Sequence, residues 1–103
     1  MKKNQHPKPK EYRVKYKING DIGEFIQYYN VFHSSEALDF LAHTFRKNHI
    51  EGNQLLVIII EEYDRFKDTW NDRTEKAIEF AESPEIVINN KEVFLIKDKN
   101  GIH

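Results

Sequence analysis

An unbroken apolar run near the middle of the chain limits the folds that this sequence can adopt. Residues 55–60 are six apolar residues in succession, and Glu61 and Glu62 follow them at once. A run this short and this rich in β-branched residues predicts a strand over residues 54–63. Successive side chains of a strand point to opposite faces, so apolar residues at both parities predict a sheet covered on both sides. We therefore expect a central strand in which all four residues of the range 57–60 are buried.

Length and composition indicate one globular domain. The chain has 103 residues, of which 39% are hydrophobic and 32% charged, which suffices for one core with a charged surface. No segment approaches the ~20 apolar residues of a membrane helix, and no apolar stretch follows the charged N-terminus as in a secretory signal. The chain has no cysteine, which excludes disulfides, thiolate zinc sites and cysteine nucleophiles. We expect a cytoplasmic protein with no membrane partner.

The first half of the chain changes from a period of two to a helical period. Tyr12, Val14 and Tyr16 alternate with basic residues, which predicts a half-buried strand with a basic outer face. The sequence Asn-Gly-Asp at 19–21 predicts a turn, and residues 24–32 follow as a second strand. A helix is expected from Ser34, its N-cap, to about residue 48. Its apolar face consists of Leu38, Leu41, Ala42 and Phe45.

The second half of the chain is predicted to contain a second helix and a hairpin at its end. Trp70, Thr74 and Ala77 recur at helical spacing, which predicts a helix over about residues 69–82 with Trp70 in the core. Residues 85–88 and 92–97 read as a hairpin about Asn89-Asn90-Lys91, because Asn tolerates a positive φ. The predicted fold is a single α+β domain over residues 11–103, in the order ββαβαββ, with an antiparallel or mixed sheet. The first helix packs on one face, and the second helix or a partner subunit covers the other.

Charge is distributed unevenly along the chain. Residues 1–20 carry a net charge of +6, whereas residues 21–103 carry −7. The Lys-rich segment 1–10 is expected to be a disordered tail. Together with the first strand it forms the candidate nucleic-acid contact, which consists of Lys8, Lys10, Arg13, Lys15 and Lys17. The rings of Tyr12 and Tyr16 fall on the opposite parity to these cations, which argues against base stacking and predicts only weak phosphate binding.

Aromatic residues in the second strand suggest a protein interface. The strand carries more large apolar side chains than one face of a sheet needs. Trp70 is a further candidate anchor of an interface if the predicted second helix faces solvent. The candidate interface residues are Phe25, Tyr28, Tyr29, Phe32 and Trp70. A homodimer built on this face or edge of the sheet is the expected assembly.

Nothing in the sequence predicts an active site. Glu61 and Glu62 are adjacent on a strand, so they point to opposite faces and do not share an ion. His43 and His49 lack the spacing of helical metal ligands, and His33 has no motif around it. We expect no catalytic residue, metal or cofactor. The leading hypothesis is a non-enzymatic interaction or accessory module that self-associates or binds another protein. The alternative is an accessory protein that binds nucleic acid weakly through its basic N-terminal segment.

Overall fold

The computed structural model describes residues 8–48 and 54–96 and confirms the α+β fold class. Its elements are β1 (Lys10–Ile18), β2 (Phe25–Val31), α1 (Ser34–Asn48), β3 (Gln54–Asp64), β4 (Thr69–Asp72), α2 (Thr74–Phe80), β5 (Ile86–Asn89) and β6 (Glu92–Ile96). The order is the predicted one, with the short strand β4 added between β3 and α2. The predicted tail falls largely on residues 1–7, which lie outside the described part of the chain.

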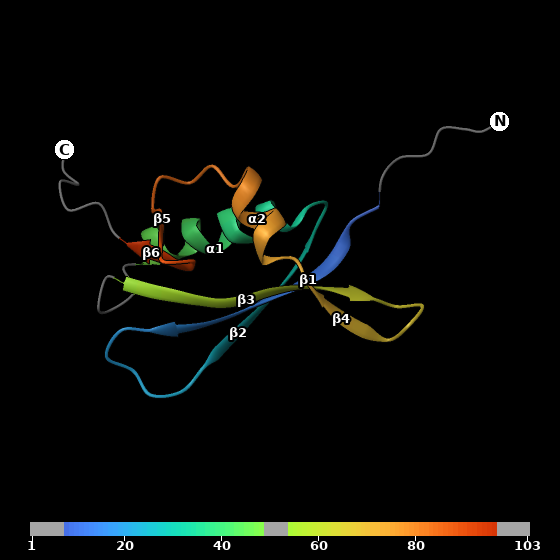
Figure 1. Ribbon diagram of the computed structural model, residues 1–103, viewed down its shortest axis with the longest axis horizontal. Helices are drawn as coiled ribbons and strands as arrows, with labels where there is room; N and C mark the ends of the chain where they lie inside the picture. The colour runs from blue at the N-terminus through green and yellow to red at the C-terminus, as the bar shows by residue number, and fades with distance from the viewer. Residues whose placement is uncertain (1–7, 49–53, 97–103) are drawn as a thin grey trace.

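All strand pairs are antiparallel and form one six-stranded sheet. Its order is β2-β1-β3-β6-β5, and β4 pairs with the C-terminal end of β3 (Figure 1). The central apolar strand β3 therefore pairs with β1 on one side and with β6 and β4 on the other. The strands β2 and β5 form the two edges of this order.

Both helices pack on the same face of the sheet, so the alternative in which the second helix covers the other face was wrong, and cover by a partner subunit stays a prediction (Figure 1). Ala77 of α2 belongs to the same buried cluster as Leu38 and Leu41 of α1 and Val14 and Leu55 of the sheet. The physical reason is that α2 has only seven residues and a small apolar face, which fits against α1. The opposite face of the sheet, called the open face below, carries neither of the two helices of the described residues.

Only half of the residues 57–60 are buried because the open face is uncovered, and a β-bulge in β3 determines which two they are. Val57 and Ile60 lie in the core, whereas Ile58 is 38% exposed and Ile59 is half-buried. The β1–β3 register shifts between Lys15 and Tyr16, so β3 contains one extra residue at this point. The bulge sets the two residues between Val57 and Ile60 outside the core, and the prediction that all four are buried was wrong for Ile58 and Ile59.

Strand β4 occupies the segment that was predicted to begin the second helix. Trp70 pairs with Tyr63 of β3, and the hairpin turn includes Asp68 with φ of 56°. Asp72 then accepts hydrogen bonds from the backbone N–H and the hydroxyl of Thr74, at 2.9 and 2.7 Å, where α2 begins. The helical placement of Trp70 was therefore wrong, because pairing with β3 outweighs its helical spacing to Thr74 and Ala77.

The other chain reversals agree with the sequence prediction. The β5–β6 hairpin turns at Asn90 and Lys91, with φ of 53° and 69°. Gly20 and Gly23 take positive φ in the β1–β2 connection, where a side chain would be strained.

The helix α1 ends at Asn48 as expected, but the residue that caps its first turn is not the predicted one. His33 Nδ1 accepts the N–H of Ser35 at 3.0 Å, so the ring of His33, rather than Ser34, caps the helix.

Candidate functional site

The edge strand β2 is the longer of the two uncharged edge strands in the described part of the chain. Its sequence, FIQYYNV, contains no charged residue, no proline and no glycine. Natural edge strands usually carry lysine, proline or a bulge, which prevent another strand from pairing with them. None of these features interrupts β2, which pairs with β1 without a break from Phe25 to Val31. An edge of this kind is suited to accept a further strand.

The backbone groups of β2 are divided between β1 and the free edge. Ile60 donates its N–H to Thr74 Oγ1 and accepts the N–H of Arg73, so its backbone points away from β1. Bonding direction alternates along a strand, so odd-numbered residues of β1 bond to β3 and even-numbered ones to β2. Through the β1–β2 register, the odd-numbered residues of β2 bond to β1. Ile26, Tyr28 and Asn30 therefore direct their N–H and C=O groups to the free edge.

Apolar side chains surround this edge on both sides of the sheet. Five of them are between 37% and 54% exposed and are called the β2 patch: Phe25, Ile26, Tyr28, Phe32 and Phe40. Phe40 comes from α1 and stacks on Tyr29, with ring centroids 6.2 Å apart and planes at 15°. Large exposed apolar groups gathered at one place mark interaction surfaces, whereas single ones do not. Phe25, Tyr28 and Phe32 lie at this surface, as the interface hypothesis requires.

The other two candidate interface residues have different positions. Tyr29 is half-buried on the helix-covered face, where it packs against the core beneath Phe40. Trp70 is half-buried on the open face, 6.2 Å from the ring of Tyr28 and 5.1 Å from that of Tyr63. Sequence reasoning missed Phe40 and Ile26. The available signal was that Phe40 lies outside the apolar stripe of α1, and that Ile26 belongs to an uncharged run.

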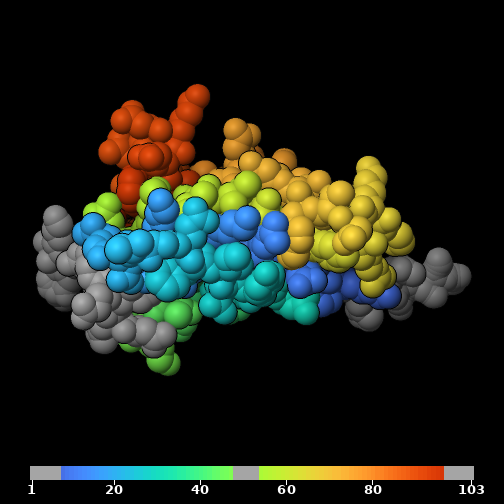
Figure 2. Space-filling model, turned by 90° about the horizontal axis from the view of Figure 1, so that it is seen from below, coloured from blue at the N-terminus to red at the C-terminus, as the bar shows by residue number. Residues whose placement is uncertain are grey.

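The open face combines rings with cations, which the alternation within β1 alone did not predict. Arg13 places its guanidinium carbon 4.0 Å from the centroid of Trp70, and its Nε bonds to Glu61 Oε1 at 2.7 Å. The rings beside Arg13 come from β2, β3 and β4 rather than from β1. Figure 2, seen from the side away from the helices, shows β1, β2 and β4 at the surface. The expectation that rings and cations lie on opposite faces holds within β1 but not across the sheet.

The five basic candidates do not form one patch. Lys10 lies 3.6 Å from Glu62 on the helix-covered side, and Arg13 is held by Glu61 on the open face. Within residues 8–48 and 54–96, Lys15 and Lys17 form no ion pair, and their register partners on β3 are Ile59 and Leu56. Lys8 is exposed ahead of β1. Two of the five cations are therefore neutralised by the fold.

The carboxylates at the end of β3 are engaged by protein groups. Glu61 and Glu62 point to opposite faces, as the sequence predicted. Glu62 accepts hydrogen bonds from the Tyr12 hydroxyl at 3.4 Å and from Arg73 Nε at 3.2 Å. Asp64 accepts the N–H groups of Phe66 and Lys67, at 2.9 and 3.2 Å, and so closes the β3–β4 turn. Each carboxylate has a structural role of its own.

The structure of residues 8–48 and 54–96 contains no cluster of potential metal ligands. There, no three His, Asp or Glu side chains lie close enough together to hold a metal ion. His33 packs edge-on against Phe80 and caps α1, and His43 lies 3.4 Å from Arg46 on the surface of α1. His49 lies outside the described residues.

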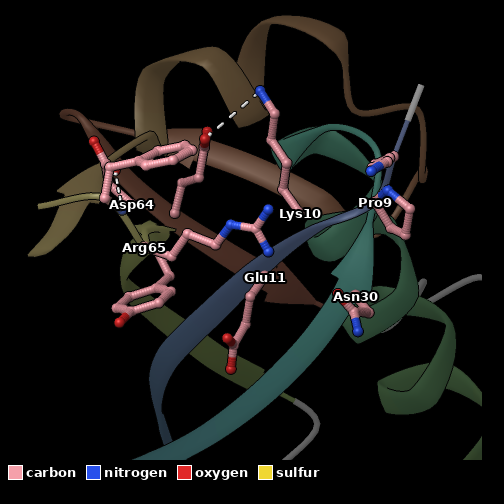
Figure 3. Close-up of a pocket in the computed structure, with 10 residues that line it drawn as sticks. Pro9, Lys10, Glu11, Asn30, Asp64 and Arg65 are labelled. Atoms are coloured by element: carbon pink, nitrogen blue, oxygen red, sulfur yellow. Dashed lines mark hydrogen bonds and ion pairs between the residues drawn. The ribbon is translucent and has the colours of Figure 1, made fainter. Parts of the chain in front are cut away.

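A cavity of about 640 Å³ lies where β1 begins and β3 ends, beside the β3–β4 turn (Figure 3). Lys10, Glu11 and Arg65 gather around it, and Asp64 and Asn30 lie at its margin. Its charged lining consists of three basic and three acidic side chains: Lys8, Lys10, Arg65, Glu11, Glu62 and Asp64. Such a balanced lining favours neither an anion nor a cation. The cavity also lacks a nucleophile beside a base, so its chemistry does not define a reaction.

Burial affects the ionisation of tyrosines in the core and packed against it, including Tyr12 and Tyr29. It raises the pKa of Tyr12 to about 12, and the charge of Glu62 and the hydrogen bond to it add to this effect. Burial also raises the pKa of Tyr29. Both phenols are neutral structural groups at ordinary pH, since neither pKa moves toward neutrality.

Comparisons with protein-family models, curated proteins and solved structures gave no match. Neither α1 nor α2, the two helices of the described residues, has the length and apolar character of a membrane-spanning segment.

Proposed function

We propose that this protein is a non-enzymatic interaction module that self-associates in the cytoplasm through its β2 edge. The observation that supports this proposal is the uncharged strand β2, in which the outward backbone groups of Ile26, Tyr28 and Asn30 have no strand partner among residues 8–48 and 54–96. Main-chain bonds supply affinity when a strand is added to an edge, and side-chain pockets supply specificity. The apolar patch around β2 adds the hydrophobic part of such an interface.

The size of the patch approaches what a stable dimer needs. Its five side chains are about half exposed, and a large side chain buries ~150–250 Å² when it is covered completely. Together they offer roughly 500 Å² per copy, before any backbone area is counted. A specific interface needs about 1,200 Å² in total, or about 600 Å² per copy. The β2 edge therefore comes close to the required area with its side chains alone.

A second copy of this chain is the partner that the charge of the edge favours. β2 has no charge, so two copies meet there without repulsion and without leaving a charge unpaired. A partner of strongly acidic or basic character would gain nothing from this strand. The side chains of the β2 patch are likewise uncharged, so the same argument holds for them.

Weak nucleic-acid binding is the less favoured function. Lys10 and Arg13 are already paired with carboxylates, which lowers the positive charge available for phosphates. The ring of Trp70 is covered by Arg13 on one side and lies close to Tyr28 and Tyr63. Single-strand binding requires rings that are free to stack on bases.

Two matched lysine substitutions test the proposed function. Ile26 on β2 is 45% exposed, and Ile88 on the opposite edge strand β5 is 50% exposed. Light scattering after size exclusion should give twice the 12.3 kDa chain mass for the native protein and for Ile88→Lys. Ile26→Lys should give the monomer mass, because a lysine on an edge strand opposes pairing. A native protein that is monomeric at high micromolar concentration would contradict the proposal, as would a dimer that Ile26→Lys leaves intact.

A further inference from the structure

We propose that two copies join through antiparallel pairing of β2 with β2, about a two-fold axis at Tyr28, so that their sheets become one. This inference rests on the self-association proposed above and adds which residues meet. A two-fold contact uses the same surface on both copies, so it requires a strand that complements itself. β2 meets this requirement in its backbone, its side chains and its charge.

The backbone determines the position of the axis. The three residues that direct N–H and C=O groups outward are Ile26, Tyr28 and Asn30, and Tyr28 is the middle one. With the axis at Tyr28, this residue faces its own copy and Ile26 faces the partner's Asn30. Directly opposed residues of this kind exchange two hydrogen bonds in an antiparallel ladder. All three outward N–H groups and all three outward C=O groups of each copy then have a partner.

A shift of the axis by one residue loses part of this pairing. With the axis at Gln27, Asn30 would face the partner's Glu24, which precedes β2. With the axis at Tyr29, Ile26 would face the partner's Phe32, which follows β2. In both cases one outward-facing residue is opposite a residue that lies outside β2, and its hydrogen bonds to the partner strand are lost. Only the axis at Tyr28 matches all three outward-facing residues with residues of β2.

The side chains agree with this register on both faces. On the open face, Tyr28 meets its own copy, and each Tyr28 has Trp70 beside it with ring centroids 6.2 Å apart. The pairing thus places four rings in a row across the axis, and cross-strand aromatic pairs stabilise sheets. On the helix-covered face, Phe40 stacks on Tyr29 and is 51% exposed. The helix α1 therefore brings an apolar side chain to the same edge as a second layer.

Single nitroxide labels on β2 test the register directly. The chain has no cysteine, so Ile26→Cys, Tyr28→Cys and Asn30→Cys each provide one labelling site. All three positions are exposed and lie on the same face of the strand. In the proposed dimer the two copies of position 28 have Cα atoms ~5.5 Å apart. The copies of position 26, and those of position 30, are offset by four residues along the strands and lie ~14 Å apart.

The expected result is the strongest dipolar broadening of the spectrum at position 28, with weaker and equal broadening at positions 26 and 30. A label at Ile88→Cys on β5 should show no broadening. Light scattering on the same labelled samples gives their oligomeric state, and a cooperative thermal transition shows that each is folded. If the label at position 28 prevents association, equal broadening at positions 26 and 30 still identifies the axis.

The remaining outcomes separate this inference from the proposed function. A dimer with its strongest broadening at position 26 or 30 would overturn the axis at Tyr28. A dimer without broadening at any of the three positions would overturn the pairing of β2 and leave self-association standing. A native protein that is monomeric under the same conditions would overturn both proposals.

Discussion

Arg13 stacks on Trp70, with the guanidinium carbon 4.0 Å from the ring centroid, while its Nε bonds to Glu61 at 2.7 Å. This contact joins three strands, because Arg13 lies on β1, Glu61 on β3 and Trp70 on β4. A cation and a ring of this kind are groups from which a nucleic-acid site on the open face would be built. Here they bind each other, so the contact stabilises the sheet and leaves neither group free.

The first prediction concerns nucleic acid. A short single-stranded oligonucleotide should bind with a Kd of only ~10⁻⁴–10⁻⁶ M and lose affinity steeply with salt, because phosphate contacts supply the binding. The chain has one tryptophan, so its fluorescence reports on Trp70 alone. We expect no quenching when the oligonucleotide binds, since Arg13 occupies the ring. Nanomolar binding that quenches Trp70 and persists at high salt would mean that bases stack on the open face.

The bulge in β3 predicts unequal effects of two neighbouring substitutions. Ile60→Ala should lower the free energy of unfolding by ~2–5 kcal/mol, because Ile60 is completely buried and its truncation leaves a cavity. Ile58→Ala should cost less than half as much, since Ile58 is 38% exposed. Urea denaturation of both variants measures the difference. Equal losses for the two variants would contradict the placement of the bulge.

The hydrogen bonds of Asp39 are expected to stabilise the packing of the two helices. Its carboxylate accepts the backbone N–H groups of Glu82 and Ser83, at 3.0 and 2.9 Å, and so ties the chain after α2 to α1. Asp39→Ala removes the acceptor for both groups and should lower the free energy of unfolding by ~1–3 kcal/mol. Asp39→Asn keeps one carbonyl acceptor and should cost less. If the two variants unfold at the same denaturant concentration, these hydrogen bonds do not contribute as stated.

The raised pKa of Tyr12 predicts that the protein loses stability at alkaline pH. Its pKa is raised from 10.0 to about 12 in the folded protein, first by burial and then by Glu62. The folded state therefore keeps a proton that the unfolded state releases, so the free energy of unfolding falls as pH rises through this interval. Tyr12→Phe should make the decline shallower, as urea unfolding at a series of pH values would measure. An unchanged slope in Tyr12→Phe would contradict the assignment.

Much of the fold could be predicted because local patterns and tertiary contacts agree. The alternation of Tyr12, Val14 and Tyr16 places these side chains on the helix-covered face, and Leu38 and Leu41 mark the buried face of α1. The β5–β6 turn at Asn90 and Lys91 follows from the tolerance of Asn for positive φ. These features depend on a few residues that are close in the sequence, and a single chain contains that information.

The features that were missed depend on contacts between distant segments. Trp70 has helical spacing to Ala77, but strand pairing with Tyr63 determines its conformation. The bulge at Ile58 follows from the β1–β3 register, which no local pattern encodes. The same is true of the rings around Arg13, because strand order decides which side chains share a face. The uncharged composition of β2 was visible in the sequence, but its position at an edge was not.

Hydrogen exchange at β2, measured at several protein concentrations, tests the central claim most directly. In a monomer the outward N–H groups of Ile26, Tyr28 and Asn30 have no ladder partner among the described residues, and we expect them to exchange rapidly at every concentration. If β2 is the self-association edge, these three amides become protected as the concentration rises to high micromolar values, while those of β5 do not change. Exchange at Ile26, Tyr28 and Asn30 that is equally fast at low and high concentration would contradict the claim.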